Sequence, residues 1–567
     1  MAAACPLGMT LDSQTINDLN KEFRLCNHAS EIFSSKMFLA TVRRNILQET
    51  RRCQALPVFW RPQTTQPKPL EESEAFCVKN PDIAEVDASQ VRSFEDIPGP
   101  ARGFRSFVEF YRKSEGFAKG HKLSKSLFAK YGPIYKESFS GHTMIHIIDP
   151  NDTEKVFRAQ GKYPRRLTPD FWISYGKRRN GIAGLILRDG EEWHRLRQII
   201  SPKVMRPKTV EENLDNFNAV ADDAVSRFVK LKEACGPDDC IPDLEGEMSK
   251  FATESIGTMA FDSRLGLYND QPPKEALKYI RANHEFFTLS QKLIFSIPSN
   301  LVRPYMDTPT LKKFFKAADV ALEIGNGFVN KKIKELNEQA EKGVEASSDV
   351  VPVLAYLYAK EELTREEKNG LALELVGGGV HTTANLLLWL LYNLGTFPRI
   401  QEKLIQEIDK VVGYKSYITA EHIAKMPYLK FCVKESLRFT PTVAILSRVL
   451  DQDVVLSGYH VPAKTIVVID LFSACHNENI FKDPSEFRPE RWMRENKDEQ
   501  HAFANLQFGY GVRMCVGRRI AEMEVYLLIC KLLQRFRIEY NNEPLESIQM
   551  MFLAPDKPVK IKFVDRV

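Results

Sequence analysis

The sequence predicts a mainly α-helical protein with a minor β component. From about residue 105 onward, apolar residues recur at intervals of three and four, most clearly over residues 154–163, 213–233 and 310–338, which is typical of amphipathic helices. Runs typical of strands are few and short, near residues 143, 453 and 465. Apolar residues make up 43% of the chain and charged residues 27%, which favours a globular protein over a fibrous, disordered or polytopic membrane protein.

Charge and cysteine content exclude further classes. The net charge of +5 is small for 567 residues and is not concentrated in one segment, so we expect no nucleic-acid binding. The ten cysteines include no C-x-x-C pair, which argues against zinc sites of that type and against a disulfide framework. We therefore expect a reducing compartment, in which a functional cysteine is identified by its neighbours.

Residues 1–62 are expected to form an N-terminal extension whose second part, residues 37–62, is a mitochondrial transit peptide. That part carries five arginines and a single acid, Glu49, which is the basic, acid-poor composition of such peptides. A basic solvated helix at a domain edge is the alternative, and Met37 could be an alternative start. No apolar run near the N-terminus approaches the roughly 20 residues of a membrane anchor helix.

A polar linker, residues 63–93, is expected to lead into one folded domain, residues 94–567. The motif IPGP at residues 97–100 marks the entry into this domain. Two prolines that flank a glycine fix a rigid turn there.

The segment 375–398 contains no Asp, Glu, Lys or Arg and is long enough to span a membrane, but we expect a helix through the core of a large soluble domain. The three glycines 377–379 and the polar residues 381–383 are costly against lipid, yet useful where a buried helix loosens over a ligand. Thr364 and Glu367 have the spacing of a capping box, which predicts that the helix begins there.

Only Cys515 has informative neighbours. It lies in the segment FGYGVRMCVGRRIAE, residues 508–522, before a helix predicted to begin near Gly517. The helix dipole and the free N–H groups should lower the pKa of the thiol and favour a metal-binding thiolate, and Gly511 and Gly517 let the backbone approach a flat macrocycle. For an arbitrary cysteine, a small buried apolar side chain would be the better interpretation.

Phe508, Gly511, Arg513, Cys515 and Gly517 resemble the haem loop of the cytochrome P450 family. The resemblance implies that Cys515 is the axial ligand of haem b (iron protoporphyrin IX), that Arg513 pairs with a haem propionate and that Phe508 packs near the sulfur. A thiolate ligand pushes electron density onto iron and favours O–O cleavage. The likeness extends from about residue 94 to the C-terminus and implies the cytochrome P450 fold, a single compact triangular haem domain.

Further motifs resemble the same family and follow its order along the chain. Trp193 and Arg197 lie one helical turn apart in GEEWHRLR and resemble propionate partners. Arg448 stands where the family commonly supplies another propionate contact.

A buried ionic network is also implied by the resemblance. Glu435 and Arg438 in KESLR have the i, i+3 spacing at which a carboxylate and a guanidinium meet. Arg491 in FRPERW fits the third position of the family's network behind the thiolate loop. Taken alone, the first two residues would more often be a surface pair of little energetic value.

The glycine-rich helix carries the expected catalytic residues His381, Thr382 and Thr383, together with Gly379. His381 departs from the family pattern, because an Asp or Glu usually stands there and helps to deliver protons to the bound dioxygen. The reference pKa of histidine, about 6.5, would allow an imidazole relay with a titration in that range. There are two alternatives. His381 could have no role in proton delivery, with water carrying the protons, or the activity could be reduced or altered.

Two details, besides the expected transit peptide at residues 37–62, resemble the mitochondrial branch of the family. Arg519 follows Arg518, and Lys430 and Lys434 lie at i, i+4 on one helix face, as in members that dock an acidic [2Fe–2S] ferredoxin. Cationic steering would raise the association rate of such a donor. A solvated helix face is the alternative for the lysines alone.

The resemblance implies a monooxygenase that inserts one oxygen atom of O₂ into a lipophilic substrate, which could be steroid-like, another lipid or a xenobiotic. Electrons would come from NADPH through ferredoxin reductase and the ferredoxin, at the matrix side of the mitochondrial inner membrane, with peripheral membrane association. A P450-fold isomerase or dehydratase that needs no O₂, and a haem-based ligand sensor, are the alternatives. The sequence does not fix the substrate, the regiochemistry or the oligomeric state.

Overall fold

The computed structural model describes residues 91–566, except 102–103, 116, 140–141, 179–183, 236–239, 262, 296–306, 342–351 and 416. The expected transit peptide at residues 37–62, and nearly all of the expected linker at 63–93, lie outside the described residues. The described part is mainly helical with small β-sheets, as predicted.

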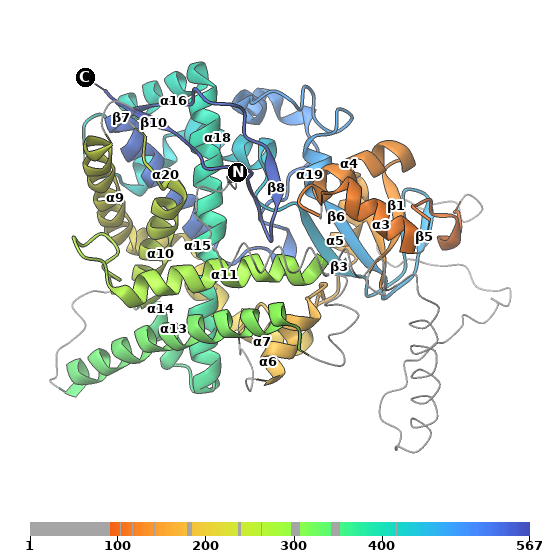
Figure 1. Cartoon of the computed structure of the whole chain (residues 1–567), viewed down its shortest axis with the longest axis horizontal. Coiled ribbons are helices and arrows are strands. Elements are labelled where there is room, and N and C mark those ends of the chain that lie inside the picture. The colour runs from red at the N-terminus through yellow and green to blue at the C-terminus, as the bar shows by residue number, and fades with distance from the viewer. Residues whose placement is uncertain are drawn as a thin grey trace, which may run out of the picture. The chain divides into compact units, whose positions relative to one another are not determined.

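Helices form most of the described chain (Figure 1). They are α3 (Phe104–Lys113), α4 (Gly120–Tyr131), α5 (Pro150–Arg158), α6 (Asp170–Arg178), α7 (Gly190–Val204), α8 (Pro207–Glu212), α9 (Leu214–Ala234), α10 (Leu244–Phe261), α11 (Lys274–Phe295), α13 (Pro309–Glu341), α14 (Val353–Tyr358), α15 (Arg365–Thr396), α16 (Pro398–Val411), α17 (Ala420–Ala424), α18 (Pro427–Phe439), α19 (Leu471–Cys475) and α20 (Arg518–Arg535). Short 3-10 helices include η5 (Pro489–Trp492) and η7 (Gly511–Arg513). The segments that periodicity predicted to be helical contribute to α5, α9 and α13.

Helix α15 is the central core helix, as predicted, and Figure 1 shows it running through the helical part with α11 and α13 crossing it. The predicted capping box begins it: the Glu367 amide donates to Thr364 Oγ1 at 3.2 Å, and the Thr364 amide donates to Glu367 Oε2 at 3.0 Å. The helix is long and apolar enough to cross a membrane, but most of its residues are buried against α10, α13, α18, α20 and other elements of the protein.

Four strands form the largest sheet, in the order β1-β2-β6-β3. The strands are β1 (Ile134–Phe139), β2 (His142–Ile147), β3 (Ile445–Val449), β4 (Val454–Leu456), β5 (Tyr459–Val461), β6 (Ile466–Asp470), β7 (Phe536–Glu539), β8 (Ser547–Gln549), β9 (Leu553–Pro555) and β10 (Lys562–Asp565). Strands β2 and β6 are parallel, whereas β1 and β3 pair antiparallel to their neighbours. Strand β3 places Arg448 opposite the buried Val467 of β6.

The IPGP turn docks directly on β1. The Lys136 amide donates to the Pro98 carbonyl at 2.7 Å, and a Cβ atom on Gly99 would lie 1.9 Å from the Lys136 carbonyl oxygen. Only glycine permits that close approach of two backbones. The turn thus joins the start of the described chain to the sheet.

Candidate functional site

The Cys515 loop is a tight backbone turn that ends in a helix N-terminus. The amide of Cys515 donates to the Phe508 carbonyl at 2.8 Å, and Gly509 and Gly511 adopt φ values of +72° and +73°, which favour glycine. A Cβ on Gly511 would also lie 2.3 Å from Nε2 of Gln160. Helix α20 begins at Arg518 with Gly517 as its N-cap, close to the predicted start.

The environment of the Cys515 thiol differs from the expectation. Burial raises the pKa of the thiol, although the Gly517 amide and the charges of Arg197 and Arg518 act to lower it. Desolvation therefore outweighs the helix N-terminus, and the predicted net lowering of the pKa was wrong. Cys515 nevertheless keeps accessible surface.

Arginines expected at the propionates lie around this loop. Arg513 donates to Asp189 and lies 4.4 Å from the centroid of the Trp193 ring, measured from Cζ. Arg197 of α7 donates to the Met514 carbonyl at 2.9 Å. The structure thus gathers Trp193, Arg197 and Arg513 at the Cys515 loop.

Buried positive charge exceeds buried negative charge beside the loop. Burial and the charge of Arg513 lower the pKa of Arg448 to about 10, and burial and the charge of Arg166 lower the pKa of Arg513 to about 10. Arg448 donates to Gln160 Oε1 and to the Ser447 carbonyl, and among the described residues no carboxylate pairs with it. Such a cluster fits a ligand that carries two carboxylates, as haem does.

Glu435, Arg438 and Arg491 form one fully buried network. The Glu435 carboxylate accepts from Arg438 Nη2 at 2.8 Å and from Arg491 Nε at 2.9 Å. It also accepts from Trp492 Nε1 at 3.0 Å and from the Arg488 amide at 2.9 Å. The guanidinium groups donate their remaining protons to carbonyls of residues 475–486. The network therefore ties α18 to the segment around η5.

The glycine-rich part of α15 has an open and a packed side. A Cβ on Gly378 would meet no atom within 4 Å, whereas a Cβ on Gly379 would lie 3.3 Å from Ile256 of α10. Thr382 Oγ1 donates to the Gly378 carbonyl at 2.8 Å. Thr383 is instead buried beside Glu524 of α20. The two threonines thus serve different sides of the helix.

His381 faces α11. Its ring centroid lies 5.5 Å from that of His284 and 5.1 Å from that of Phe287. Burial, together with the nearby charge that His284 can carry, lowers the pKa of His381 to about 3. The imidazole is therefore neutral near pH 7, and the expected titration in the ordinary imidazole range is not what these surroundings produce.

The two lysines expected to meet a ferredoxin lie on the outer side of α18. Lys434 is exposed, and its Nζ lies 3.8 Å from the centroid of the Trp492 ring. Lys430 is half-buried and donates to the Ala424 carbonyl at 3.3 Å. Arg518 and Arg519 are also exposed at the start of α20. Partial desolvation is the main cause that lowers the pKa of Lys434, and the charge of Arg518 lowers it further.

Sequence reasoning missed three ionisable residues whose pKa values are shifted mainly by desolvation. Arg166 and Glu374 both contact the backbone of Ile186, and Glu524 lies between α10 and α15. The one signal for Glu374 was its place as a lone acid just before the uncharged part of α15. Arg166 sits among several basic residues and had no distinguishing pattern.

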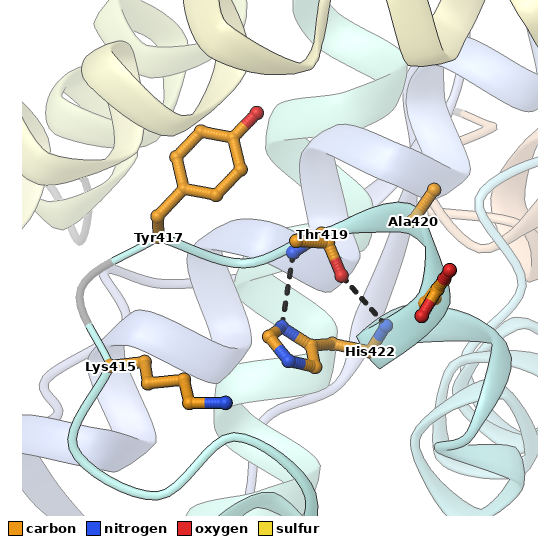
Figure 2. A pocket seen from close by; sticks show the side chains of 6 residues that line it. Lys415, Tyr417, Thr419, Ala420 and His422 are labelled. Carbon is orange, nitrogen blue, oxygen red and sulfur yellow. Dashed lines mark hydrogen bonds between the residues drawn. The ribbon is translucent and has the colours of Figure 1, made fainter.

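A surface pocket lies elsewhere, around α17, and is drawn in Figure 2. The Thr419 amide donates to His422 Nδ1 and the His422 amide donates to Thr419 Oγ1, both at 3.1 Å. These atoms satisfy one another as a helix cap. None of the pocket's lining residues belongs to the expected site.

Comparison with known proteins gives one family. The model of the family described as Cytochrome P450 matches residues 99–563. The mitochondrial 1,25-dihydroxyvitamin D(3) 24-hydroxylase of Rattus norvegicus is 31% identical over 84% of this chain and 90% of its own length. The mitochondrial cholesterol side-chain cleavage enzyme of Oncorhynchus mykiss is 31% identical over 83% and 90%, and the mitochondrial sterol 26-hydroxylase of Rattus norvegicus is 30% identical over 85% and 90%.

Proposed function

The chain belongs to the mitochondrial branch of the cytochrome P450 family, and on that premise we propose that it hydroxylates a sterol-like lipophile with O₂ and electrons from NADPH. The family makes the protein a haem-dependent monooxygenase, an oxidoreductase. The observation that carries the proposal is Cys515, deep but accessible at the start of α20 and close to a cluster of buried arginines.

The residues of the Cys515 loop would hold haem b. Cys515 would be the axial ligand, and Phe508 would pack beside its sulfur. The excess buried charge of Arg448 and Arg513, with Arg197 and Trp193 nearby, would bind the two propionates. A Cβ on Gly517 would meet no atom within 4 Å, which leaves room for a flat group, whereas the space at Gly511 is filled by the Gln160 side chain. When bound, the haem supplies the activation of O₂ that inserts one oxygen atom into the substrate while the other leaves as water.

Protons would reach the site through hydroxyl groups and water. The Thr382 hydroxyl donates to the Gly378 carbonyl beside the open side of α15, and its oxygen can accept a hydrogen bond from a water molecule. His381 would act as a neutral side chain, because its pKa is lowered to about 3, and Thr383 would stabilise the helix on the α20 side.

The proposed electron donor is a [2Fe–2S] ferredoxin that receives electrons from an NADPH-dependent reductase. Lys430, Lys434 and Arg519 offer exposed or half-exposed cationic groups for an acidic partner. We place the protein at the matrix side of the inner membrane, with residues 37–62 as its transit peptide, where a lipophilic substrate could enter from the membrane.

The sterol-like substrate class rests on the names of the relatives, which act on vitamin D, cholesterol and sterols. Because these relatives are named as hydroxylases or as a side-chain cleavage enzyme, a peroxide-rearranging isomerase and a ligand sensor are not favoured. Other lipids and xenobiotics are the comparison compounds for the test.

The test is oxygen consumption by the purified protein with NADPH, ferredoxin and reductase in the presence of sterols, secosteroids and apolar xenobiotics. We expect product in proportion to O₂ consumed with a sterol or secosteroid. Product from xenobiotics alone would contradict the substrate class, and rearrangement of a peroxide without O₂ uptake would contradict the reaction.

The proposed ligand has a separate test. Cys515→Ala should abolish the red-shifted carbon monoxide spectrum of the reduced protein, because no thiolate would remain at the loop. Cys530→Ala, in a fully buried position on α20, the helix that follows the Cys515 loop, is the control and should retain the spectrum. A Cys515→Ala protein that kept the spectrum would refute the assignment.

A further inference from the structure

Residues 184–189, here called the strap, are held at both ends by charged side chains. At one end the Ile186 amide donates to Glu374 Oε2 at 2.8 Å, and the Ile186 carbonyl accepts from Arg166 Nη2 at 2.8 Å. At the other end Arg513 donates to Asp189. The strap therefore connects α15 to the Cys515 loop.

The strap backbone lies directly on the Glu374 carboxylate. A Cβ on Gly184 would lie 2.1 Å from both the carboxyl carbon and Oε2 of Glu374, so only glycine permits this contact. The Leu185 amide also interacts with the carboxylate. Because a carboxylate accepts backbone N–H groups more strongly than a neutral group does, its charge should set how firmly the strap is held.

The charges that act on Glu374 come from two neighbouring segments. Burial raises the pKa of Glu374 to about 7, while the Leu185 and Ile186 amides, Arg166 and Arg188 act to lower it. Burial also lowers the pKa of Arg166, which the charges of Asp189 and Glu374 counteract. The carboxylate thus depends on a few fixed partners and can gain a proton near neutral pH.

The position of Glu374 on α15 links the strap to the proposed site. Glu374, Gly378 and Thr382 follow one another at intervals of four and share one helix face. Gly378 borders open space on that face and accepts the Thr382 hydroxyl. The strap is therefore anchored to the side of α15 that carries Thr382 of the proposed proton path.

We propose that Glu374 and Arg166 are positioning residues that fix the strap, and through Asp189 the Arg513 side chain, and that protonation of Glu374 loosens the strap. The consequence for the site rests on the proposed function, in which Arg513 binds a propionate. The hold on the strap itself involves no cofactor chemistry.

The experiment is hydrogen–deuterium exchange of the Leu185 and Ile186 amides in the resting holoprotein, corrected for intrinsic exchange at each pH. In the wild type we expect protection to fall about tenfold from pH 8 to pH 6, the scale of one hydrogen bond to a charged group. Glu374→Gln should already show this lower protection at pH 8, with no further change at pH 6. Arg166→Gln should also lower it.

Glu366→Gln is the matched control, because Glu366 is an exposed acid in the first turn of the same helix, and it should behave as the wild type. Wild-type protection in Glu374→Gln, or an unchanged pH dependence in that variant, would overturn the proposal. If Glu374→Gln lost the carbon monoxide spectrum through misfolding, the wild-type pH series would decide, and a flat series would overturn it. The exchange measurement needs neither ferredoxin nor substrate. A failed turnover assay would therefore contradict the proposed function without affecting the exchange result for the strap.

Discussion

At the scale of single residues, His381 shows how its partners determine what a side chain can do. An imidazole surrounded by water has a pKa of about 6.5, but the side chain packs against His284 and Phe287 of α11. Burial then lowers its pKa to about 3, so the protonated form is absent at working pH. A neutral imidazole can still donate one hydrogen bond and accept another within a chain of water molecules.

We therefore expect His381→Ala to uncouple oxygen consumption from product formation without changing the pH profile between pH 6 and pH 8. His381→Gln keeps a neutral polar group and should retain most of the coupling. The measurement is the ratio of product to O₂ consumed across that pH range. A wild-type titration near the ordinary imidazole pKa that vanished in His381→Ala would contradict this account.

Burial shifts the pKa of a second residue, Glu524, in the opposite direction. Glu524 is fully buried between α10 and α15, and burial raises its pKa to about 8. Between its ordinary pKa and pH 8, the folded protein holds a proton that the unfolded chain has released. The free energy of unfolding should therefore fall as pH rises through this window, by up to about 1.4 kcal/mol per pH unit.

Glu524→Gln removes that titration, so this variant should gain stability relative to the wild type as pH rises from 6 to 8. Urea denaturation at the two pH values measures the difference. Glu543→Gln, at an exposed position, should show none. A wild type and a Glu524→Gln variant with parallel pH dependence would contradict the raised pKa.

At the scale of elements, the Glu435 network fastens α18 to the segment around η5. Replacing Glu435 by Gln would leave two buried guanidinium groups without a counter-charge, because Arg438 and Arg491 share this one carboxylate. Breaking a buried pair in this way costs roughly 3–5 kcal/mol. We expect a loss of that size in the free energy of unfolding, measured by urea denaturation.

Glu421→Gln is the control for this prediction, since Glu421 is exposed and lies 4.0 Å from Lys425. Its stability should change by less than about 1 kcal/mol. Similar losses in the two variants would mean that the network contributes no more than a surface ion pair does.

The elements also explain what the sequence could predict. The Cys515 loop and the Glu435–Arg438 pair are defined by short spacings, so a local pattern carries them. Strand β3 lies at the edge of its sheet, and buried and exposed residues do not alternate along it, so no alternation marked it as a strand.

Tertiary contacts explain the errors in the site. The pKa of His381 depends on α11, and that of Cys515 depends on burial by the whole core. Glu374 and Arg166 come from distant parts of the sequence and both bind the backbone of Ile186. None of these contacts can be predicted from the spacing of residues along the chain. The class of the fold and the haem loop can be, because each has a local sequence pattern.

At the scale of the whole molecule, the proposed electron transfer requires a second protein to dock on the face that carries Lys430 and Lys434. Lys430 and Lys434 extend from α18, and the same helix holds Glu435 of the buried network. Lys434 also lies over Trp492, whose Nε1 donates to Glu435. The two lysines are thus attached to a helix that the buried network holds in place. An experiment can separate the effect of their charge from their effect on the structure.

The double charge reversal Lys430→Glu and Lys434→Glu should lower kcat/KM for ferredoxin-supported turnover by at least about tenfold, because steering of an acidic partner depends on these charges. Turnover supported by peroxide needs no partner and should be nearly unchanged. Lys331→Glu with Lys334→Glu is the charge-matched control, since both lysines are exposed on α13, and it should leave both assays intact. The wild-type rate should also fall with rising ionic strength, whereas the reversed variant should lose most of that dependence. Equal losses with ferredoxin and with peroxide would instead mean that the substitutions disturb the Trp492 and Glu435 contacts, and the pair would then be structural.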